Sequence, residues 1–391
     1  MARRLCGEEN YPPPLLAVAG FGLPRARRAF PREPLADEPW AALLSAARSH
    51  RLTGHLRAAV DQDALPATEA QAHQARVAHR SAMLRVLSLE RELISVVDLL
   101  ATSDIEVRVL KGSAFARLDY AQPALRSFID LDILVRPTDI DRAVRVLVTA
   151  GFMRTLAQPR PGFDRRFDKG TTLASPTGYE LDLHRTFVLG PWGALVDLDG
   201  LWDRGQEFTI GGRTVHALSR ANRFLHASYH AALGDWPLRL GSLRDIAEML
   251  RHFDQDGLDQ DGEALIGLAS DWGVEAVVAA AVADTHRLLD IAITGELGTW
   301  AQCYVPSQRE ESRLALHTHA DRNFAAQALA TLPILPRFRD KVAYLRALVL
   351  PDVGYTAGRH SSAWARLRYG LQEVRRGRSP RSNTAPEASI E

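Results

Sequence analysis

The sequence predicts an α+β fold in which a small mixed sheet is flanked by N-terminal and C-terminal helical parts. Three observations support this prediction: a long helical pattern, then short strand-like segments between helices, then helical patterns only. We expect an irregular lead-in and helical segment over 1–102, an α/β core over 103–217, a helical domain over 218–376 and a disordered tail over 377–391.

The composition is typical of a globular protein of the reducing cytoplasm. The 391 residues are 46% hydrophobic and 24% charged, with a net charge of +1. No apolar run approaches the ~20 residues that a membrane span needs, so we expect no membrane partner. The first residues do not resemble a secretion signal. Cys6 and Cys303 are too far apart to indicate a disulfide framework or a zinc site.

The N-terminal region is predicted to be an irregular lead-in to about residue 36, followed by helices. Residues 69–101 have the longest helical pattern in the chain, because apolar residues recur there at spacings of seven, three and four. We expect this helix to pack on the next domain through one apolar stripe. The stripe consists of Val77, Leu84, Leu87, Ile94, Val97 and Ala101.

The core is predicted from β-branched and alternating segments. The strand candidates are residues 106–110, 128–135, 152–156, 166–173 and 178–184. Residues 208–216 are predicted to form a hairpin with Gly211-Gly212 as its turn. Thr138 is expected to cap a helix that ends at Gly151.

The C-terminal region is predicted to be helical. The candidate helices are residues 220–232, 240–253, 274–291, 324–331, 338–348 and 364–376. His226 and His230 are four residues apart, a spacing that can bind a metal. Because no third ligand is near them in the sequence, packing or a surface role is the favoured interpretation. Asp245 is expected to cap a helix or to pair within this region.

Two aspartates share one face of the second predicted strand. Asp130 and Asp132 are two positions apart, and alternate side chains of a strand point to the same face. Neighbouring carboxylates repel each other unless a cation or a proton lies between them. A divalent metal site is therefore the leading hypothesis, with phosphoryl or nucleotidyl transfer as the leading chemistry.

A Lys-Gly-Ser turn precedes these aspartates. Gly112 and Ser113 begin a short predicted helix, where backbone N–H groups and a hydroxyl can bind phosphate oxygens. Lys111 adds a positive charge, and it is one of three lysines in a chain with 45 arginines. Arg126 is placed either to reach a phosphate or to form a salt bridge with a nearby acid.

A later strand offers a third carboxylate. Glu180, Asp182 and His184 share one face of the strand predicted at 178–184. Three polar groups on one face are costly to bury, so this face is either exposed to solvent or part of a site. We favour a site, because the aspartate pair requires such a partner.

The order of these motifs carries a family resemblance. The matching segments are Val109-Leu110-Lys111-Gly112, Leu125-Arg126, the strand from Asp130 to Val135, Asp182-Leu183-His184, FLHASYHA from Phe224 and LRDIAEML from Leu243. The chain resembles the polymerase-β-like nucleotidyltransferase superfamily, and more narrowly an uncharacterised nucleotidyltransferase family of bacteria. The resemblance covers about residues 80–255.

The resemblance implies an enzyme with a nucleotidyltransferase core that uses Mg²⁺, with two ions expected. It would move a nucleoside monophosphate from a nucleoside triphosphate such as ATP to an acceptor and release pyrophosphate. Asp130, Asp132 and Asp182 would be the catalytic metal ligands, with Asp182 as proton acceptor and Glu180 as its rival. The nucleotide would be bound by the phosphate turn and by neighbouring cations: Lys111, Gly112, Ser113 and Arg126.

Two other functions remain open. A non-catalytic nucleotide- or peptide-binding scaffold of the same fold is the main alternative, supported by the long interval between Ser113 and Asp130. An RNA-modifying transferase is less favoured, because a net charge of +1 does not indicate a polyanion-binding surface. The acceptor remains open among a small molecule, a peptide or protein, and RNA.

Overall fold

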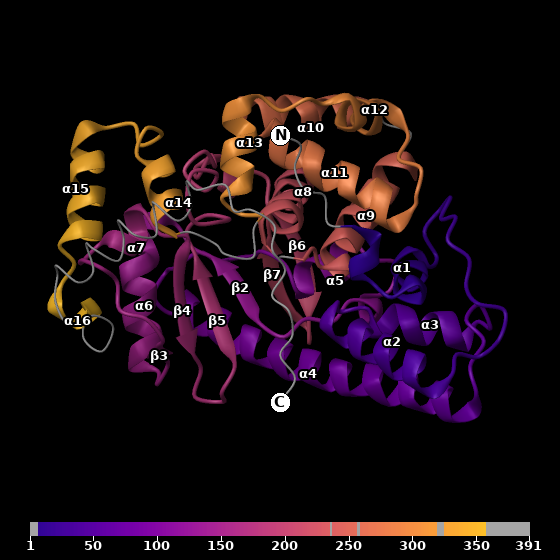
Figure 1. The fold of residues 1–391 in the computed structure, drawn as a ribbon. Coiled ribbons are helices and arrows are strands. Elements are labelled where there is room, and N and C mark those ends of the chain that lie inside the picture. Colours follow the sequence, from indigo (N-terminus) through magenta and orange to yellow (C-terminus); the bar gives the residue numbers. More distant parts are fainter. Residues whose placement is uncertain (1–6, 235–236, 256–258, 319–323, 357–391) are drawn as a thin grey trace, which may run out of the picture.

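The computed structural model describes residues 7–234, 237–255, 259–318 and 324–356, and it shows a seven-stranded mixed sheet surrounded by helices (Figure 1). The predicted α+β fold is confirmed. The strand order is β3-β4-β5-β2-β1-β7-β6. The strands are β1 (Arg108–Val109), β2 (Leu131–Leu134), β3 (Met153–Arg154), β4 (Gly170–Ala174), β5 (Glu180–His184), β6 (Gln206–Ile210) and β7 (Arg213–Ala217).

The centre of the sheet brings together strands that are distant in the sequence. β2 pairs in parallel with β5 on one side and antiparallel with β1 on the other, and β1 pairs in parallel with β7. In the β2–β5 register Asp132 lies opposite Asp182, and Leu134 lies opposite His184. The parallel pairing therefore places the polar side chains of two separate strands next to each other.

Several predicted strand ends change in the structure. β2 begins only at Leu131, so Asp130 precedes the strand rather than lying within it. β4 begins at Gly170, because Phe163–Arg166 forms the short helix α7. The hairpin prediction is confirmed: both glycines of its turn have positive φ, as a two-residue hairpin turn of this kind requires.

The N-terminal helices are α1 (Pro13–Gly20), α2 (Asp37–Ser49), α3 (Thr53–Asp61) and α4 (Glu69–Ala101). The prediction of an irregular lead-in is wrong over α1, whose residues from Leu15 to Gly20 are all buried. A helix that is apolar on every side has no amphipathic period, so the periodicity criterion missed it. Pro13 and Pro14 occupy its first turn, where a missing N–H has no cost.

Helix α4 has the predicted bounds but presents a different face. Thr68 and Gln71 form a capping box at its N-terminus. Leu84 and Leu87 of the predicted stripe are each 61% exposed. The large apolar side chains of its buried face are Val86, Leu89, Leu93, Val96 and Leu100. Two apolar stripes overlap on this leucine-rich helix, and packing against α3, α2 and α6 (Ile140–Thr149) selects the second.

Two short helices complete the core region. α5 (Ser113–Leu118) follows β1, and α6 (Ile140–Thr149) follows β2. The helix predicted to start at Thr138 begins as a 3₁₀ turn, and Thr138 makes no capping hydrogen bond. α6 packs through its buried residues Ile140, Ala143 and Leu147.

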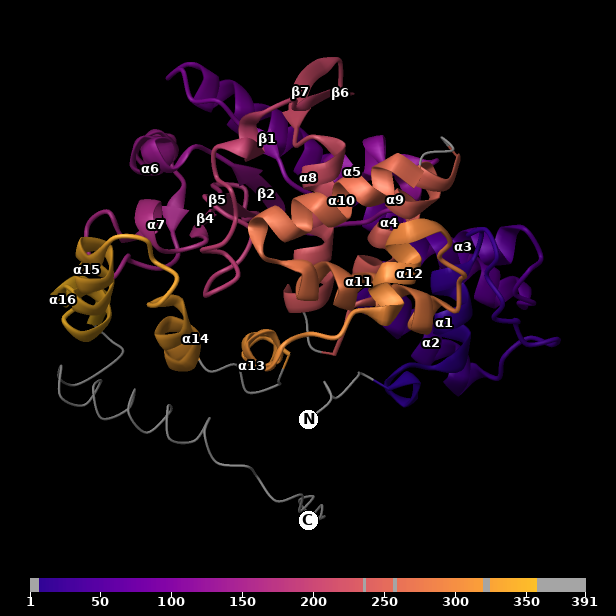
Figure 2. The same ribbon diagram turned by 90° about the horizontal axis from the view of Figure 1, so that it is seen from above.

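The C-terminal helices lie in two groups (Figure 2). Helices α8 to α13 pack together near the centre, and α14 and α15 lie on the side of α7, where Phe163, Phe167 and Tyr344 form a second apolar cluster. The bounds are α8 (Arg220–Tyr229) continued by a π turn (His230–Gly234), α9 (Leu240–Gln255), α10 (Asp259–Trp272), α11 (Glu275–Leu289), α12 (Gly295–Cys303), α13 (Gln308–Ala315), α14 (Phe324–Thr331), α15 (Phe338–Val349) and α16 (Val353–Thr356).

The predicted domain boundaries remain predictions. The helix expected at 364–376 and the tail expected at 377–391 lie outside the described residues. Within the part of the chain that is described, no helix combines the length and apolarity needed to cross a membrane.

Hydrogen bonds from buried arginines join the C-terminal helices to the sheet region and to the segment around α1. Arg223 of α8 donates two hydrogen bonds to the carboxylate of Asp119, at 2.9 and 3.0 Å, just after α5. Arg244 of α9 pairs with Glu248 and donates to the carbonyl oxygens of Ala19 and Phe21 beside α1. Because buried charges are costly without partners, these pairs specify how the helices dock.

We predict that Arg223→Met lowers the free energy of unfolding by about 3–5 kcal/mol, because Asp119 stays buried without its guanidinium. Denaturant unfolding measures this loss. Arg213→Met is the matched control, since it removes an ion pair with Asp98 whose two side chains are about half exposed, and should cost less than ~1 kcal/mol. Equal losses in the two variants would contradict the role of the buried pair.

Candidate active site

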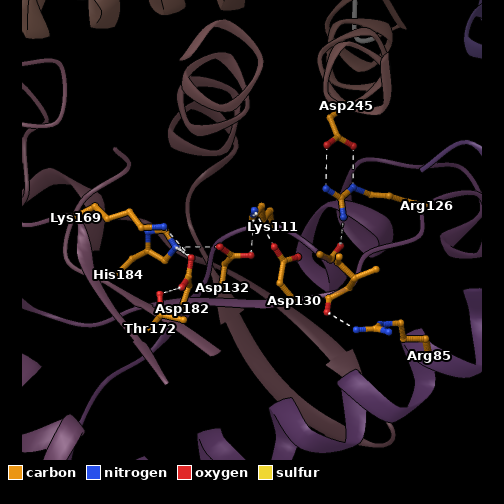
Figure 3. A network of polar contacts seen from close by, with 12 residues as sticks. Arg85, Lys111, Arg126, Asp130, Asp132, Lys169, Thr172, Asp182, His184 and Asp245 are labelled. Carbon is orange, nitrogen blue, oxygen red and sulfur yellow. Dashed lines mark hydrogen bonds and ion pairs between the residues drawn. The ribbon is translucent and has the colours of Figure 1, made fainter. Parts of the chain in front are cut away.

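The site is built around the carboxylate of Asp132, which lies between two basic side chains (Figure 3). Its Oδ2 is 3.2 Å from the Nζ of Lys111, and its Oδ1 is 2.9 Å from the Nε2 of His184. Burial raises the pKa of a carboxyl group, but Lys111 and His184 outweigh burial here and hold the pKa of Asp132 well below its usual range. Asp132 is therefore ionised although it is buried.

Lys111 joins the two aspartates that the sequence singled out. Its Nζ is 3.6 Å from the Oδ2 of Asp130, so one ammonium group contacts both carboxylates. Burial lowers the pKa of a lysine, yet the two aspartates raise that of Lys111 above its usual value. The ammonium group lies where the sequence hypothesis expected a cation.

Asp182 completes the set of three aspartates from the neighbouring strand. Its carboxylate accepts a hydrogen bond from Lys169 Nζ at 2.8 Å and another from the hydroxyl of Thr172. Burial raises its pKa, and Lys169 and His184 outweigh that effect to lower it. Glu180, the rival third carboxylate, is largely exposed, and the partial loss of water around it, together with the charge of Asp182, raises its pKa.

His184 is oriented as metal-binding histidines usually are. Its Nδ1 faces the carbonyl oxygen of Thr186 at 3.1 Å, which turns Nε2 toward Asp132 and, at 3.8 Å, toward Asp182. One ligand atom from each of Asp132, Asp182 and His184 lies within 4.8 Å of the others. Two carboxylates and one imidazole are a suitable donor set for a divalent cation.

Asp132 thus separates two positions that suit a cation. One lies between Asp130 and Asp132 and is lined by oxygen atoms, as Mg²⁺ prefers. The other lies among Asp132, Asp182 and His184. A carboxylate that offers one oxygen to each position is the arrangement that a two-metal site requires.

The phosphate turn predicted at Gly112 and Ser113 lies beside Lys111. Gly112 has φ +58°, a conformation that would strain any residue with a side chain. The Ser113 hydroxyl is buried and has no hydrogen-bond partner in the described structure. Helix α5, which starts there, has only six residues. The feature most in need of a ligand is thus the serine hydroxyl rather than the helix end.

The guanidinium of Arg126 is paired with Asp245 rather than with Asp130, Asp132 or Asp182. Its guanidinium donates to both carboxylate oxygens of Asp245 on α9, at 2.7 and 2.9 Å, and to the carbonyl oxygen of Gly112 at 3.1 Å. Of the two roles considered for Arg126, the structure shows the salt bridge. Tyr120 also donates to Asp245, at 2.7 Å. Asp245 therefore pairs across to the core and not within the helical region.

His226 lies on α8 and His230 begins the π turn that continues it, where it lines a small pocket together with Lys111 and Asp130. His226 packs against the rings of Phe115 and Phe187. Burial, together with the charges of His184 and Lys111, lowers the pKa of His226 to about 3. Burial, together with the charge of Lys111, lowers the pKa of His230 well below its usual value. Both rings are neutral near pH 7. Neither belongs to the group of close ligand atoms found among the described residues, so packing remains favoured over metal binding.

Comparison of the chain with known proteins identifies its family. A family model described as "Uncharacterised nucleotidyltransferase" matches residues 36–290, from just before α2 to the end of α11. The chain belongs to this nucleotidyltransferase family. The match includes the whole sheet and the helix that carries Asp245, whereas α1 and α12 to α16 lie outside it.

Other comparisons add little to this assignment. Among solved structures, an antigenic nucleotidyltransferase-like protein from Paracoccidioides brasiliensis is similar at 16% identity, over 49% of this chain and 91% of that chain. The TM-score is 0.27, so the likeness carries no argument. None of the curated proteins compared matches the chain.

Two residues of the site were not assigned from the sequence. His184 was placed on the correct face of its strand, but its contact with Asp132 depends on strand pairing. Lys169 lies just before β4 and reaches Asp182 across the β4–β5 pair. The rarity of lysine was the available signal, since two of the three lysines are in this site.

Proposed function

We propose that this nucleotidyltransferase transfers the monophosphate group of a nucleoside triphosphate, such as ATP, to a hydroxyl-bearing acceptor in a reaction that requires Mg²⁺. The main support for this proposal is the placement of Asp132, whose two carboxylate oxygens face two different cation positions. Asp130 and Asp132 would hold the ion of the triphosphate, and Asp132, Asp182 and His184 the ion beside the acceptor. Mg²⁺ would supply neutralisation of phosphate charge and a lower pKa for the acceptor hydroxyl.

The chain's own residues would position the reactants and take up one proton. The acceptor oxygen forms a bond to the α-phosphorus, the bond from that phosphorus to the β-bridging oxygen breaks, and pyrophosphate leaves with the bonding electrons. Asp182 would accept the proton of the acceptor hydroxyl. Ser113, whose buried hydroxyl has no partner in the described structure, would donate to a phosphate oxygen with the N–H groups of its turn.

Lys111 and Lys169 would act as exchangeable counter-ions. Each ammonium neutralises carboxylates that would otherwise repel each other. Lysine has a flexible stem and a point charge, so it can move from a carboxylate to a phosphate at little cost, unlike a bidentate arginine. Metal and nucleotide would therefore bind together, and the ammonium groups of the two lysines would move from the carboxylates to the phosphate oxygens.

A non-catalytic nucleotide-binding scaffold is the second candidate. The observation that favours it is the same pair of lysines, because carboxylates that already have counter-ions need no metal. The two functions differ in whether pyrophosphate is released. The acceptor, whether a small molecule, a peptide or RNA, would be identified by incubating the protein with each α-labelled nucleoside triphosphate, Mg²⁺ and cell extract.

We predict that Asp132→Asn weakens binding of Mn²⁺, used as a spectroscopic substitute for Mg²⁺, by more than about 100-fold and abolishes label transfer in extract. Removing one charge from the shared ligand affects both cation positions. Electron paramagnetic resonance of free Mn²⁺ measures binding. Asp98→Asn, on an exposed part of α4, is the control. Wild-type Mn²⁺ binding and label transfer in Asp132→Asn would refute the proposed function.

We predict that Asp182→Asn lowers the rate of pyrophosphate release by about 10² to 10⁴-fold, the usual effect of losing a general base. Glu180→Gln should change this rate by less than about threefold, because Glu180 is exposed and outside the group of close ligand atoms. Rate measurements at saturating nucleotide compare the two variants. The reverse order of effects would assign the proton acceptor to Glu180.

We predict that Lys111→Met strengthens Mn²⁺ binding in the absence of nucleotide by roughly tenfold, or about 1.4 kcal/mol, because the metal no longer displaces an ammonium group. The same variant should bind nucleoside triphosphate more weakly. Lys341→Met, which changes the remaining lysine on α15, is the control. Mn²⁺ affinity equal to that of the wild type would show that Lys111 does not occupy a metal position.

A further inference from the structure

A small basic pocket lies next to Asp130, on the side away from β5. It is lined by residues from all three parts of the chain: Arg51 after α2, Lys111 and Arg126 of the core, and Arg239 before α9. Figure 3 shows Asp182 and His184 on one side of Asp132, and Asp130, Arg126 and Asp245 on the other. The pocket therefore adjoins the proposed metal site at the end opposite Asp182.

The size of the pocket limits what can bind in it. Its volume is about 30 Å³, room for about two water-sized groups. A base or a sugar ring is too large for this space. The outer oxygen atoms of one phosphate group of a longer molecule fit this space.

The lining of the pocket suits an anion. It contains four cationic side chains, the uncharged imidazole of His230 and two carboxylates, a net charge of +2. Gly241 and Ser242 in the first turn of the 16-residue helix α9 also border it, and a helix N-terminus carries partial positive charge. Charge and helix orientation thus favour the same kind of ligand.

The walls of the pocket are fixed by contacts among the three parts. The carboxylate of Asp245 accepts hydrogen bonds from Arg126 and Tyr120. The backbone N–H of Leu240 donates to His50 Nδ1 at 3.2 Å, which ties the start of α9 to the residue before Arg51. The pocket is thus a built feature of the packed chain.

We infer that this pocket binds the terminal phosphate of the nucleoside triphosphate, with Arg51 and Arg239 as positioning residues. The inference rests on the proposed function. The attacking and leaving oxygens of a phosphoryl group lie roughly in line, so an acceptor activated at Asp182 requires a leaving group on the opposite side. The pocket lies on that side, beside Asp130. The N-terminal helices thus contribute directly to nucleotide binding through Arg51.

Arg51→Gln and Arg239→Gln test this inference in the full-length protein. Isothermal titration with inorganic tripolyphosphate, ATP and AMP, each with Mg²⁺, should show at least tenfold weaker binding of tripolyphosphate and ATP. Binding of AMP should stay within twofold, because AMP has no terminal phosphate to place in the pocket. Arg48→Gln, an exposed arginine of α2, is the matched control, and Arg239→Lys should restore much of the affinity.

The outcomes separate the possible sources of the phosphate. Unchanged tripolyphosphate and ATP affinity, with a raised KM for the acceptor, would overturn the inference and assign the pocket to a phosphate on the acceptor. Wild-type behaviour in every assay would also overturn it. Weaker tripolyphosphate binding without any label transfer in the wild type would retain the pocket and refute the proposed reaction. Label transfer by the wild type, with nucleotide binding unaffected in the two arginine variants, would refute the pocket assignment and retain the proposed reaction.

A measurement on the wild-type protein covers the case in which a variant does not fold. Phenylglyoxal modifies arginine side chains, and mass spectrometry of peptides reports each position separately. Tripolyphosphate with Mg²⁺ should slow modification of Arg51 and Arg239 several-fold and leave that of Arg48 unchanged. Equal rates with and without tripolyphosphate at Arg51 and Arg239 would overturn the inference.

Discussion

The burial of the Asp132 carboxylate is the constraint on which the site depends. An ionised group inside a protein needs partners of opposite charge, and Asp132 finds them in Lys111 and His184. Lys111 follows β1 and His184 ends β5, so both neighbours of β2 in the sheet must supply a partner. The buried charge of Asp132 is therefore stabilised only when β1, β2 and β5 are neighbours in this order, and the same order brings the residues of the site together.

The same electrostatic requirement places the helical parts around the sheet. Asp245 brings α9 to Arg126, and Arg223 brings α8 to Asp119. Such buried pairs contribute little net stability compared with apolar packing, but a helix docked in another register would leave their charges unpaired. The helices that surround the aspartates are thus held in position by polar contacts.

Lysine and arginine have different roles among the buried ion pairs of this structure. The pairs that dock helices use arginine, whose planar fork binds a carboxylate at two points. The carboxylates of the site are instead paired with Lys111 and Lys169, in a chain with 45 arginines and three lysines. A group that must exchange partners during binding is better served by a mobile point charge than by a rigid fork.

What the sequence alone determined was local in character. The period of α4 predicted both its ends, the Gly211-Gly212 pair predicted the hairpin, and strand alternation predicted which polar residues share a face. These features depend on residues a few positions apart. Tertiary structure decided the rest: which stripe of α4 is buried, that α1 forms, and that Asp132 lies opposite Asp182.

Arg126 shows the physical reason for this division. Its position before Asp130 was compatible with a phosphate contact or a salt bridge, and its partner Asp245 is 119 positions away in the sequence. The period of a helix or strand predicts which face a side chain occupies, but not which part of the chain packs against that face. Strand register and helix docking are set by contacts between distant segments, and only the folded chain brings those segments together.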